Sequence, residues 1–336
     1  MNLQPIVELI EQESCFNLVA HVLPDGDSIG SLLALGEALQ SMGKTVALYS
    51  PGRLPKKYAF LKGSERIAGT GMDARRIPVV LALDCSDLER LDLFKEEVLQ
   101  ARHLVNIDHH VTNKRYGTLN LVDPQAAATG EIVLHILKAL PVPLTHSIAE
   151  ALYVAISTDT GSFKYDNTTA AAHRAAAALL ELPIKPGVLA QRIFDERPLH
   201  FFLLLKEALS TLELYEGGRL AVMTVNREML DCHGTSVEEI EGLVNYTRNI
   251  EGVEIGVLFY VENASEVKVG FRSRVVDISK LAGRLNGGGH PKAAGCRMHG
   301  SYGSVKEKVL REAAALLEQQ AAGERSSRGG RNSKHQ

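Results

Sequence analysis

The stretch NLVAHVLPDGDSIGSLLALGEAL, from Asn17 to Leu39, joins a short apolar run to a polar loop and then to a helical pattern. The apolar run is typical of a strand that is buried on both faces. We expect the helix that follows to extend from Ser31 to Met42. A strand followed by a helix is the repeating unit of a parallel sheet, so this stretch predicts an α/β fold.

Three further apolar runs follow in the first half of the chain. They are TVALYS (Thr45–Ser50), IPVVLALD (Ile77–Asp84) and HLVNID (His103–Asp108). Together with the first run they predict an N-terminal parallel sheet flanked by helices. The pattern then becomes helical between about Ala126 and Leu182.

A second β-rich region begins near Arg219 and is interleaved with helical stretches, which predicts a second, smaller α/β domain. Pro183 and Pro186 interrupt the chain between the two regions, because proline cannot continue a helix interior. The last thirteen residues contain no aliphatic or aromatic side chain and carry four Lys or Arg against one Glu. The expected organisation is a first domain at 1–185, a helical linker at 186–211, a second domain at 212–321 and a disordered basic tail at 322–336.

Composition sets limits on the class of protein. The 336 residues include 45% hydrophobic side chains, which is ordinary for a globular chain and excludes a wholly disordered or fibrous one. The 37 Lys and Arg against 40 Asp and Glu give a net charge of −3, which excludes nucleic-acid binding by bulk positive charge. Four widely spaced cysteines and no apolar run of membrane-spanning length indicate a soluble cytoplasmic protein that does not bind membranes.

Acidic and histidine residues follow three of the predicted strands. In a parallel sheet the carboxyl ends of the strands lie at one edge, where ligands bind, so these distant segments are expected to meet. So many ionisable groups in one place would repel one another unless cations neutralised them. The residues concerned are His21, Asp25 and Asp27 after the first strand, Asp84 at the end of the third, and Asp108, His109 and His110 at the end of the fourth.

Asp159, at the end of a predicted helix, is a further candidate for the same cluster. The carboxylates of Asp25, Asp27, Asp84 and Asp159 carry four negative charges, which two divalent cations would balance. Mixed Asp and His ligands without cysteine suit Mn²⁺ better than a structural zinc ion, with Mg²⁺ or Co²⁺ as alternatives. Paired metal ions are typical of phosphoryl-transfer sites.

Two glycines and a serine in the first loop complete this interpretation. Gly26 lacks a Cβ and permits a tight turn that aims the carboxylates of Asp25 and Asp27 at adjacent cations. Gly30 and Ser31 are expected to open the following helix, whose free N–H groups suit a phosphate. Because neighbouring residues in an extended chain point in opposite directions, His109 and His110 are expected to have different roles.

Seven segments resemble, in order, the motifs of the DHH phosphoesterase superfamily and its DHHA1 domain. In the first half these are HVLPDGDSIGS, LDCSD, IDHHVTN and STDTGSF, and in the second half GFRSR, DISKLAGRL and NGGGHPKAAG fall in the DHHA1 part. Length and domain pairing are most similar to the bifunctional oligoribonuclease/pAp phosphatases of the NrnA type. One position departs from the pattern, because Asn286 stands where many members have a further glycine.

This resemblance implies roles for individual residues. It places one metal ion on His21, Asp25 and Asp84 and a second on Asp27, Asp84, His109 and Asp159, with Asp84 bridging. It makes Asp108 and His110 catalytic, with Asp108 orienting the histidines and His110 facing the scissile phosphate. The substrate-binding residues it implies are Ser31, Arg272, Arg274, Gly288, Gly289 and His290.

The activity implied is metal-dependent hydrolysis of short oligoribonucleotides (nanoRNA) to mononucleotides, together with dephosphorylation of adenosine 3′,5′-bisphosphate (pAp). Expected partners are therefore short RNA, dinucleotides and pAp, with a homodimer as an open question. Two related activities stay open: a cyclic or linear dinucleotide phosphodiesterase, and a RecJ-like single-strand DNA exonuclease. A non-catalytic nucleotide-binding regulator is a further alternative, but it would require lost ligands, and all six are present.

Overall fold

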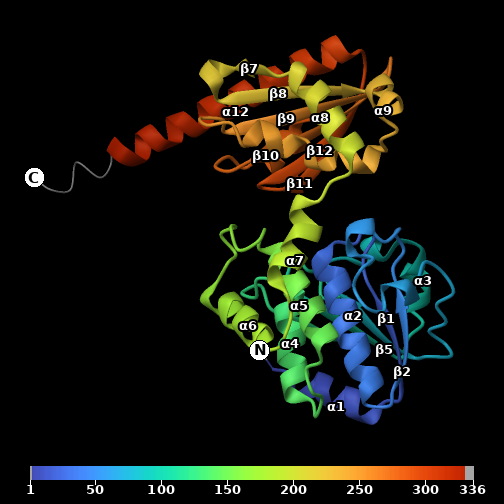
Figure 1. The fold of residues 1–336 in the computed structure, drawn as a ribbon. Helices are drawn as coiled ribbons and strands as arrows, with labels where there is room; N and C mark the ends of the chain where they lie inside the picture. The colour runs from blue at the N-terminus through green and yellow to red at the C-terminus, as the bar shows by residue number, and fades with distance from the viewer. Residues whose placement is uncertain (1, 330–336) are drawn as a thin grey trace, which may run out of the picture. The chain divides into compact units, whose positions relative to one another are not determined.

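The computed structural model describes residues 2–329, apart from the side chains of Glu238, Glu239, Glu241, His290 and residues 322–329. The chain forms two compact units that divide between Glu196 and Arg197 (Figure 1). The division falls inside the segment expected to be a helical linker, which contains α7 (Pro186–Ala190), a π-helical turn (Gln191–Asp195) and α8 (Leu199–Ser210). The two units are described separately below.

The first unit is built on a six-stranded, wholly parallel sheet in the order β3-β2-β1-β4-β5-β6, which confirms the predicted α/β class. The four predicted strands are present, and two short edge strands were not predicted. The strands are β1 (Cys15–Val19), β2 (Thr45–Tyr49), β3 (Ile67–Ala68), β4 (Val79–Leu83), β5 (His103–Asp108) and β6 (Leu119–Val122).

Helices cover both faces of this sheet. Leu18 and Leu81 face a large core under the longer helices, whereas Val19 and Val80 face a smaller core on the opposite side. This alternation explains why the strands read as continuous apolar runs. The larger core lies under α1 (Gln4–Gln12), α2 (Gly26–Ser41), α4 (Thr129–Ala139), α5 (His146–Asp159) and α6 (Ala170–Leu180). The smaller core lies under a 3₁₀ segment (Leu88–Phe94) and α3 (Lys95–Val98).

Helix α2 begins at Gly26, so the prediction that it opens at Ser31 was wrong. The reason for Gly26 also differs from the one expected. A Cβ at Gly26 would lie 2.4 Å from Oγ1 of Thr158 on α5, so glycine lets α2 and α5 approach each other closely. Figure 1 shows these two helices packed side by side.

The second unit contains a six-stranded sheet in the order β11-β12-β10-β9-β8-β7, in which only the β8–β9 pair is parallel. Its strands are β7 (Glu213–Tyr215), β8 (Leu220–Asn226), β9 (Ile255–Asn263), β10 (Glu266–Ser273), β11 (Gly288–His290) and β12 (Ala293–His299). One face packs against α11 (Ser279–Arg284) and α12 (Tyr302–Gly329), the other against α8, α9 (Arg227–His233) and α10 (Val244–Arg248).

Helix α12 continues through residues 322–329, where we expected a disordered tail. Alanine, glutamate and arginine in this segment favour helix, and no proline interrupts them. The rest of the predicted tail, residues 330–336, lies outside the described residues. Within the described part of the chain, no helix is both long and apolar enough to cross a membrane.

Candidate metal centre

The sheet order brings the predicted acidic and histidine residues together. Strand β1 lies between β2 and β4, so the chain switches direction across the sheet beside β1, and a crevice is expected at the carboxyl ends there. His21 and Asp25 follow β1, Asp84 follows β4 directly, and His109 follows β5. Asp159 is the last residue of α5.

Three overlapping groups of side chains are close enough to share a metal ion. In each group the candidate ligand atoms lie within 4.8 Å of one another. Asp84 belongs to two of the groups, and its two oxygens face different partners: Oδ2 lies 3.5 Å from Nε2 of His21, and Oδ1 lies 3.7 Å from Nε2 of His109. The groups are His21, Asp25 and Asp84; Asp27, His109 and Asp159; and Asp84, His109 and His110.

The rings of His21 and His109 both present Nε2 to this cluster. Nδ1 of His109 lies 3.2 Å from the carbonyl oxygen of Ala126, and Nδ1 of His21 lies 2.6 Å from that of Val22. A carbonyl can only accept, so each Nδ1 carries the proton and each Nε2 keeps a free lone pair. Nε2 of His21 is buried and has no hydrogen-bond partner among the described residues, which fits a metal ligand.

Asp25 combines two functions. Its Oδ1 accepts a 3.0 Å hydrogen bond from the backbone N–H of Ser28 and so caps the N-terminus of α2. Its Oδ2 points toward the cluster, 4.0 Å from Nε2 of His21. The capping interpretation and the metal-ligand interpretation of this residue are therefore compatible.

Asp27 is fully buried and held by residues that sequence reasoning did not identify. The backbone N–H groups of Thr129 and Gly130, at the N-terminus of α4, donate to its two oxygens at 2.6 Å and 2.8 Å. The hydroxyl of Thr129 also donates to Oδ1 of Asp84 at 3.1 Å. The available signal was the sequence TGEIV, in which Thr, Gly and Glu precede an apolar helical run; it is typical of a helix N-terminus but does not indicate what that N-terminus binds.

Ser31 lies inside α2, fully buried, and its hydroxyl donates to Oδ1 of Asp27 at 3.2 Å. The structure therefore places Ser31 behind a candidate metal ligand. It does not lie at the helix N-terminus where a phosphate was expected. The cause is the earlier start of the helix at Gly26.

The carboxylates of this cluster share an unfavourable environment. Burial, followed by the charge of Asp159, raises the pKa of Asp27 to about 7. Burial and the neighbouring Asp25 raise the pKa of Asp159 to about 6, against the opposing effect of His109. Burial and Asp27 also raise the pKa of Asp84. Bound cations would remove this strain, which is a further sign that the site holds metal.

His110 and Asp108 form a separate pair. Nδ1 of His110 lies 2.7 Å from Oδ1 of Asp108, and the side-chain amide of Asn113 donates to Oδ2. Burial raises the pKa of Asp108, but the hydrogen bond and charge of His110 outweigh it and lower the pKa below its ordinary value. Because Nδ1 of His110 donates to Asp108, that atom has no lone pair for a metal, although it lies 3.6 Å from Asp84.

The donor set fits a divalent cation bound by oxygen and imidazole. Cys85, which adjoins Asp84, is buried, its Sγ contacts the carbonyl oxygen of Asp87 at 3.1 Å, and burial raises the pKa of its thiol to about 11. A neutral thiol is a poor metal ligand. The site therefore offers carboxylates and neutral imidazoles, which suit hard or borderline ions such as Mn²⁺ and Mg²⁺.

The predicted substrate residues of the second unit lie at one end of its sheet. Arg272 on β10 pairs with Ala293 of β12, and Ala293 pairs with His290 of β11, so the three positions form one row. The side chain of His290 is outside what the structure describes. Arg274 follows the end of β10, where Nη2 donates to Asn249 at 3.1 Å. Gly288 and Gly289 belong to strand β11.

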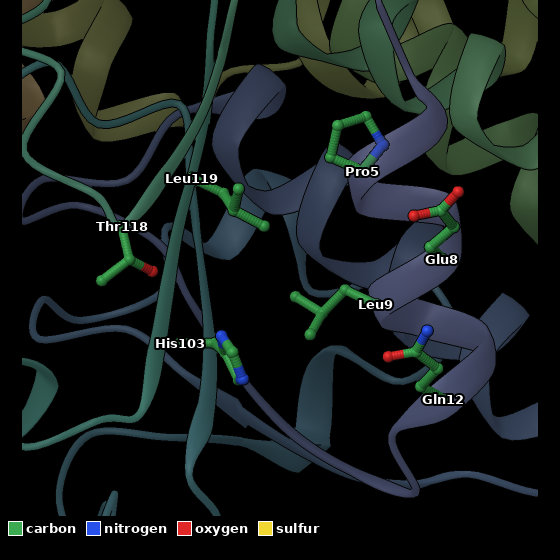
Figure 2. A pocket seen from close by; sticks show the side chains of 7 residues that line it. All are labelled: Pro5, Glu8, Leu9, Gln12, His103, Thr118 and Leu119. Atoms are coloured by element: carbon green, nitrogen blue, oxygen red, sulfur yellow. The ribbon is translucent and has the colours of Figure 1, made fainter.

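A cavity of about 270 Å³ lies elsewhere in the first unit, between α1 and the starts of β5 and β6 (Figure 2). Figure 2 shows Glu8 and Gln12 on the helix opposite His103, the first residue of β5, and Thr118, which directly precedes β6. These strand positions are at the amino ends of the sheet, whereas the metal cluster follows the carboxyl ends. The cavity therefore contributes no residue to the candidate metal centre.

Comparison with known proteins places this arrangement in a family. Residues 16–156 match the N-terminal domain of the DHH family, and residues 217–323 match the DHHA1 domain. A protein of Thermus thermophilus named "Bifunctional oligoribonuclease and PAP phosphatase NrnA" is 35% identical over 88% of this chain and 89% of its own length. A protein of the same name from Bacillus subtilis is 28% identical over 87% of this chain and 93% of its own.

The fold is shared with a solved structure. The crystal structure of an exopolyphosphatase-related protein from Bacteroides fragilis has a TM-score of 0.84 at 24% identity, and the match covers 94% of this chain and 95% of that one. The two-domain match, the relative at 35% identity and the cluster of Asp and His side chains agree with one another. The chain therefore belongs to the NrnA family of DHH–DHHA1 phosphoesterases and is a hydrolase.

Proposed function

We propose that this protein hydrolyses short oligoribonucleotides to mononucleotides and removes the 3′-phosphate from pAp. The observation that carries the proposal is the arrangement of Asp and His ligands on both sides of Asp84. The relatives' names supply the substrate class. Since all six candidate ligands come together, a non-catalytic regulator has no support.

We propose that His21, Asp25 and Asp84 hold one divalent cation and that Asp27, Asp84, His109 and Asp159 hold a second, with Mn²⁺ as the preferred ion. When bound, such a pair would lower the pKa of an attacking water molecule and would offset the charge of the phosphate. Thr129 and Ser31 act on the protein side by fixing the carboxylates of Asp84 and Asp27.

His110 is proposed as the proton donor to the leaving oxygen. Nδ1–H of His110 donates a hydrogen bond to Asp108, so this proton is held in place. The proton that His110 can transfer is therefore the one on Nε2. Burial raises the pKa of Asp108, but the hydrogen bond from His110 outweighs burial and lowers it. The carboxylate of Asp108 therefore stays charged. The hydrogen bond to Asp108 fixes the orientation of the His110 ring. Asn113 fixes the second oxygen of Asp108.

Residues of the second unit are proposed to bind the part of the substrate that does not react. Arg272 and His290 occupy one row of the sheet, and a guanidinium binds a phosphate through two parallel hydrogen bonds. Arg274 and the backbone of Gly288 and Gly289 are proposed to assist them. A binding site for the distal end would favour substrates of limited length.

Two further proposals concern the protein in the cell. We propose a cytoplasmic location, which is supported by the four cysteines, all of them free thiols in the described structure. A homodimer stays a prediction, and sedimentation analysis at several protein concentrations would test it.

The proposed function is tested with a substrate panel. Metal-free protein is supplied with Mn²⁺ and offered pAp, a linear dinucleotide, a cyclic dinucleotide, a 5-mer RNA, a 24-mer RNA and a single-stranded DNA. We expect turnover of pAp, the linear dinucleotide and the 5-mer, and little of the rest. Rapid digestion of long DNA would favour a RecJ-like exonuclease, and exclusive cleavage of cyclic dinucleotides would favour a phosphodiesterase of that class.

Variants of the adjacent histidines separate metal binding from proton transfer. His109→Ala is expected to lower the Mn²⁺ content, because Nε2 of His109 faces Asp27 and Asp159. His110→Ala is expected to keep both ions and to lower kcat by about 10²–10⁴-fold, as loss of a general acid does. Equal loss of metal in both variants, measured by elemental analysis, would contradict this division of roles.

A further inference from the structure

Arg90 is a charged residue beside the metal cluster that neither the motifs nor the proposed mechanism uses. It lies in the 3₁₀ segment Leu88–Phe94, and its side chain is half-buried. Its carbonyl oxygen accepts a 2.7 Å hydrogen bond from the backbone N–H of Val22, which fixes its backbone beside His21. Its Nη2 lies 3.0 Å from Nδ1 of His21.

The guanidinium of Arg90 forms no ion pair with any described residue, although several carboxylates lie in the same cluster. The one contact of its side chain at hydrogen-bonding distance from a described residue is with the ring of His21. A half-buried arginine is normally paired with a carboxylate or hydrogen-bonded to another acceptor. Arg90 therefore has donors available for an anion that is not part of the protein.

The approach of Arg90 to His21 does not satisfy the donors of Arg90. Nδ1 of His21 lies 2.6 Å from the carbonyl oxygen of Val22, so Nδ1 carries the ring proton and has no lone pair for a guanidinium, which only donates. The 3.0 Å separation between Nη2 and Nδ1 is therefore a close contact between two donors. An acceptor from outside the protein would relieve it.

We propose that Arg90 binds a phosphate group of the substrate. The inference rests on the proposed function, because it takes the ligand to be a nucleotide phosphate. Arginine is suited to the role, since its planar fork matches two phosphate oxygens at once.

The proposal is tested by phosphate binding, measured apart from turnover. Wild-type protein, Arg90→Ala and Arg90→Lys are stripped of metal, and inorganic phosphate is titrated by calorimetry before and after loading with Mn²⁺. Metal content is determined by elemental analysis. Arg102→Ala is the matched control, because Arg102 pairs with Glu13 and directly precedes the amino end of β5.

We expect Arg90→Ala to retain its Mn²⁺ and to bind phosphate about tenfold to hundredfold more weakly than the wild type. Arg90→Lys should recover part of this loss, because it restores the charge without the fork. The KM for pAp should rise in parallel, while Arg102→Ala behaves as the wild type. Metal-free wild-type protein should bind phosphate weakly, because the carboxylates of the cluster then repel the anion.

Two results would overturn the proposal. Loss of Mn²⁺ from Arg90→Ala would show that Arg90 acts by positioning His21, and unchanged phosphate affinity in the loaded variant would show that it does not touch the anion. A failure of the proposed function is distinguishable from both. In that case the wild type would not hydrolyse pAp or short RNA, whereas the dependence of phosphate binding on Arg90 could still be measured.

Discussion

Asp84 has a strained backbone conformation. Its φ is 56°, in the left-handed region that residues other than glycine rarely adopt, and its buried carboxylate has a raised pKa because of burial and the charge of Asp27. Strain of this kind persists at functional sites because the surrounding structure imposes it. The folded protein therefore loses stability at this position, where the carboxylate lies between two candidate metal sites.

Asp84→Asn keeps the shape of Asp84 and removes its charge. Asparagine tolerates the left-handed backbone, so the variant should fold. In the metal-free protein at pH 7.5 we expect a higher Tm than in the wild type, because one of several crowded carboxylates is gone. Hydrolysis should fall by at least about 100-fold, since changes behind metal ligands already cost about 10–100-fold. Equal or lower thermal stability of the metal-free variant would argue against carboxylate repulsion at this site.

Asn286 has a simple structural explanation. Its φ is 58°, in the left-handed region, where glycine is favoured and asparagine is the next most tolerated residue. The departure from the family's glycine pattern therefore preserves the backbone. The next position is more restricted, because a Cβ at Gly287 would lie 2.2 Å from the carbonyl oxygen of Gly295.

Substitutions at Asn286 should separate backbone strain from chemistry. We expect the free energy of unfolding of Asn286→Gly to lie within a few tenths of a kcal/mol of the wild-type value. That of Asn286→Val should be lower by about 1–2 kcal/mol, which is the cost of a left-handed conformation for a residue with a bulky Cβ. Denaturant unfolding of both variants measures this difference. Equal stability of the two would mean that the segment can adopt another backbone conformation.

At the scale of elements, the N-terminus of α4 organises the cluster as much as the strands do. Two of its backbone N–H groups hold Asp27, and the hydroxyl of Thr129 holds Asp84. A helix N-terminus stabilises negative charge, so α4 offsets part of the repulsion among the carboxylates before any cation binds. It also fixes the position of a ligand from α2 relative to a ligand that follows β4.

Thr129→Val removes the hydroxyl and leaves the shape and the backbone donors. We expect the affinity for Mn²⁺ to fall by about 10–100-fold, as changes to groups that orient metal ligands do, and Thr129→Ser to restore most of it. Thr145→Val is the control, because Thr145 caps α5 and contacts Glu37 away from the cluster. This control should lose about 1 kcal/mol of stability and keep its metal affinity. If both valine variants bind Mn²⁺ as the wild type does, the Thr129 hydroxyl has no role in the site.

The sequence predicted the central elements better than the edges. Strands β1, β2, β4 and β5 have continuous apolar runs because both faces are buried, and they were recognised from that pattern. The two-residue β3 and the half-exposed β6 have no such pattern, and the Gly-rich β11 reads as a loop. The start of α2 was misplaced because Asp25 and Gly26 resemble a turn, whereas they form a capped helix N-terminus.

The sequence predicted those residues of the candidate site that follow the ends of strands. His21, Asp84 and His109 come together because the sheet order places their strands side by side, which a parallel sheet makes predictable. Thr129, Arg90 and the altered position of Ser31 were not predictable. Their contacts depend on how α4 and the 3₁₀ segment pack, and tertiary packing of that kind leaves no local pattern in the sequence.

For the whole molecule, the cluster should make stability depend on pH. The raised pKa values of Asp27 (about 7) and Asp159 (about 6), both due first to burial, mean that the folded state binds protons near pH 6 that the unfolded state has released. This stabilisation is present at low pH and is lost as the pH rises through 6–7. His109 acts in the same direction, because its neighbouring carboxylates outweigh burial and raise its pKa.

His21 opposes this trend, since burial lowers its pKa and the folded state fails to take up a proton that the unfolded state binds below about pH 6.5. Several groups act in one direction and one acts in the other, so the folded state should bind more protons than the unfolded state between pH 5.5 and 7.5. For each such extra proton, the free energy of unfolding of the metal-free protein should fall by about 1.4 kcal/mol per pH unit as the pH rises. Tm measurements across this range, with and without Mn²⁺, check the sign. The stabilisation by Mn²⁺ should grow as the pH rises, and a Tm of the metal-free protein that rises with pH would contradict the shifts.

The two units have hydrophobic cores that share no residue in the described structure, and every candidate metal ligand belongs to the first of them. During translation, domains of this kind fold as they leave the ribosome, and residues 197–336 take about 7–28 s to be synthesised at about 5–20 residues per second. The first unit can therefore acquire its ions before the second unit exists. Metal supply during synthesis, more than exchange into finished protein, would then decide which ion the enzyme carries.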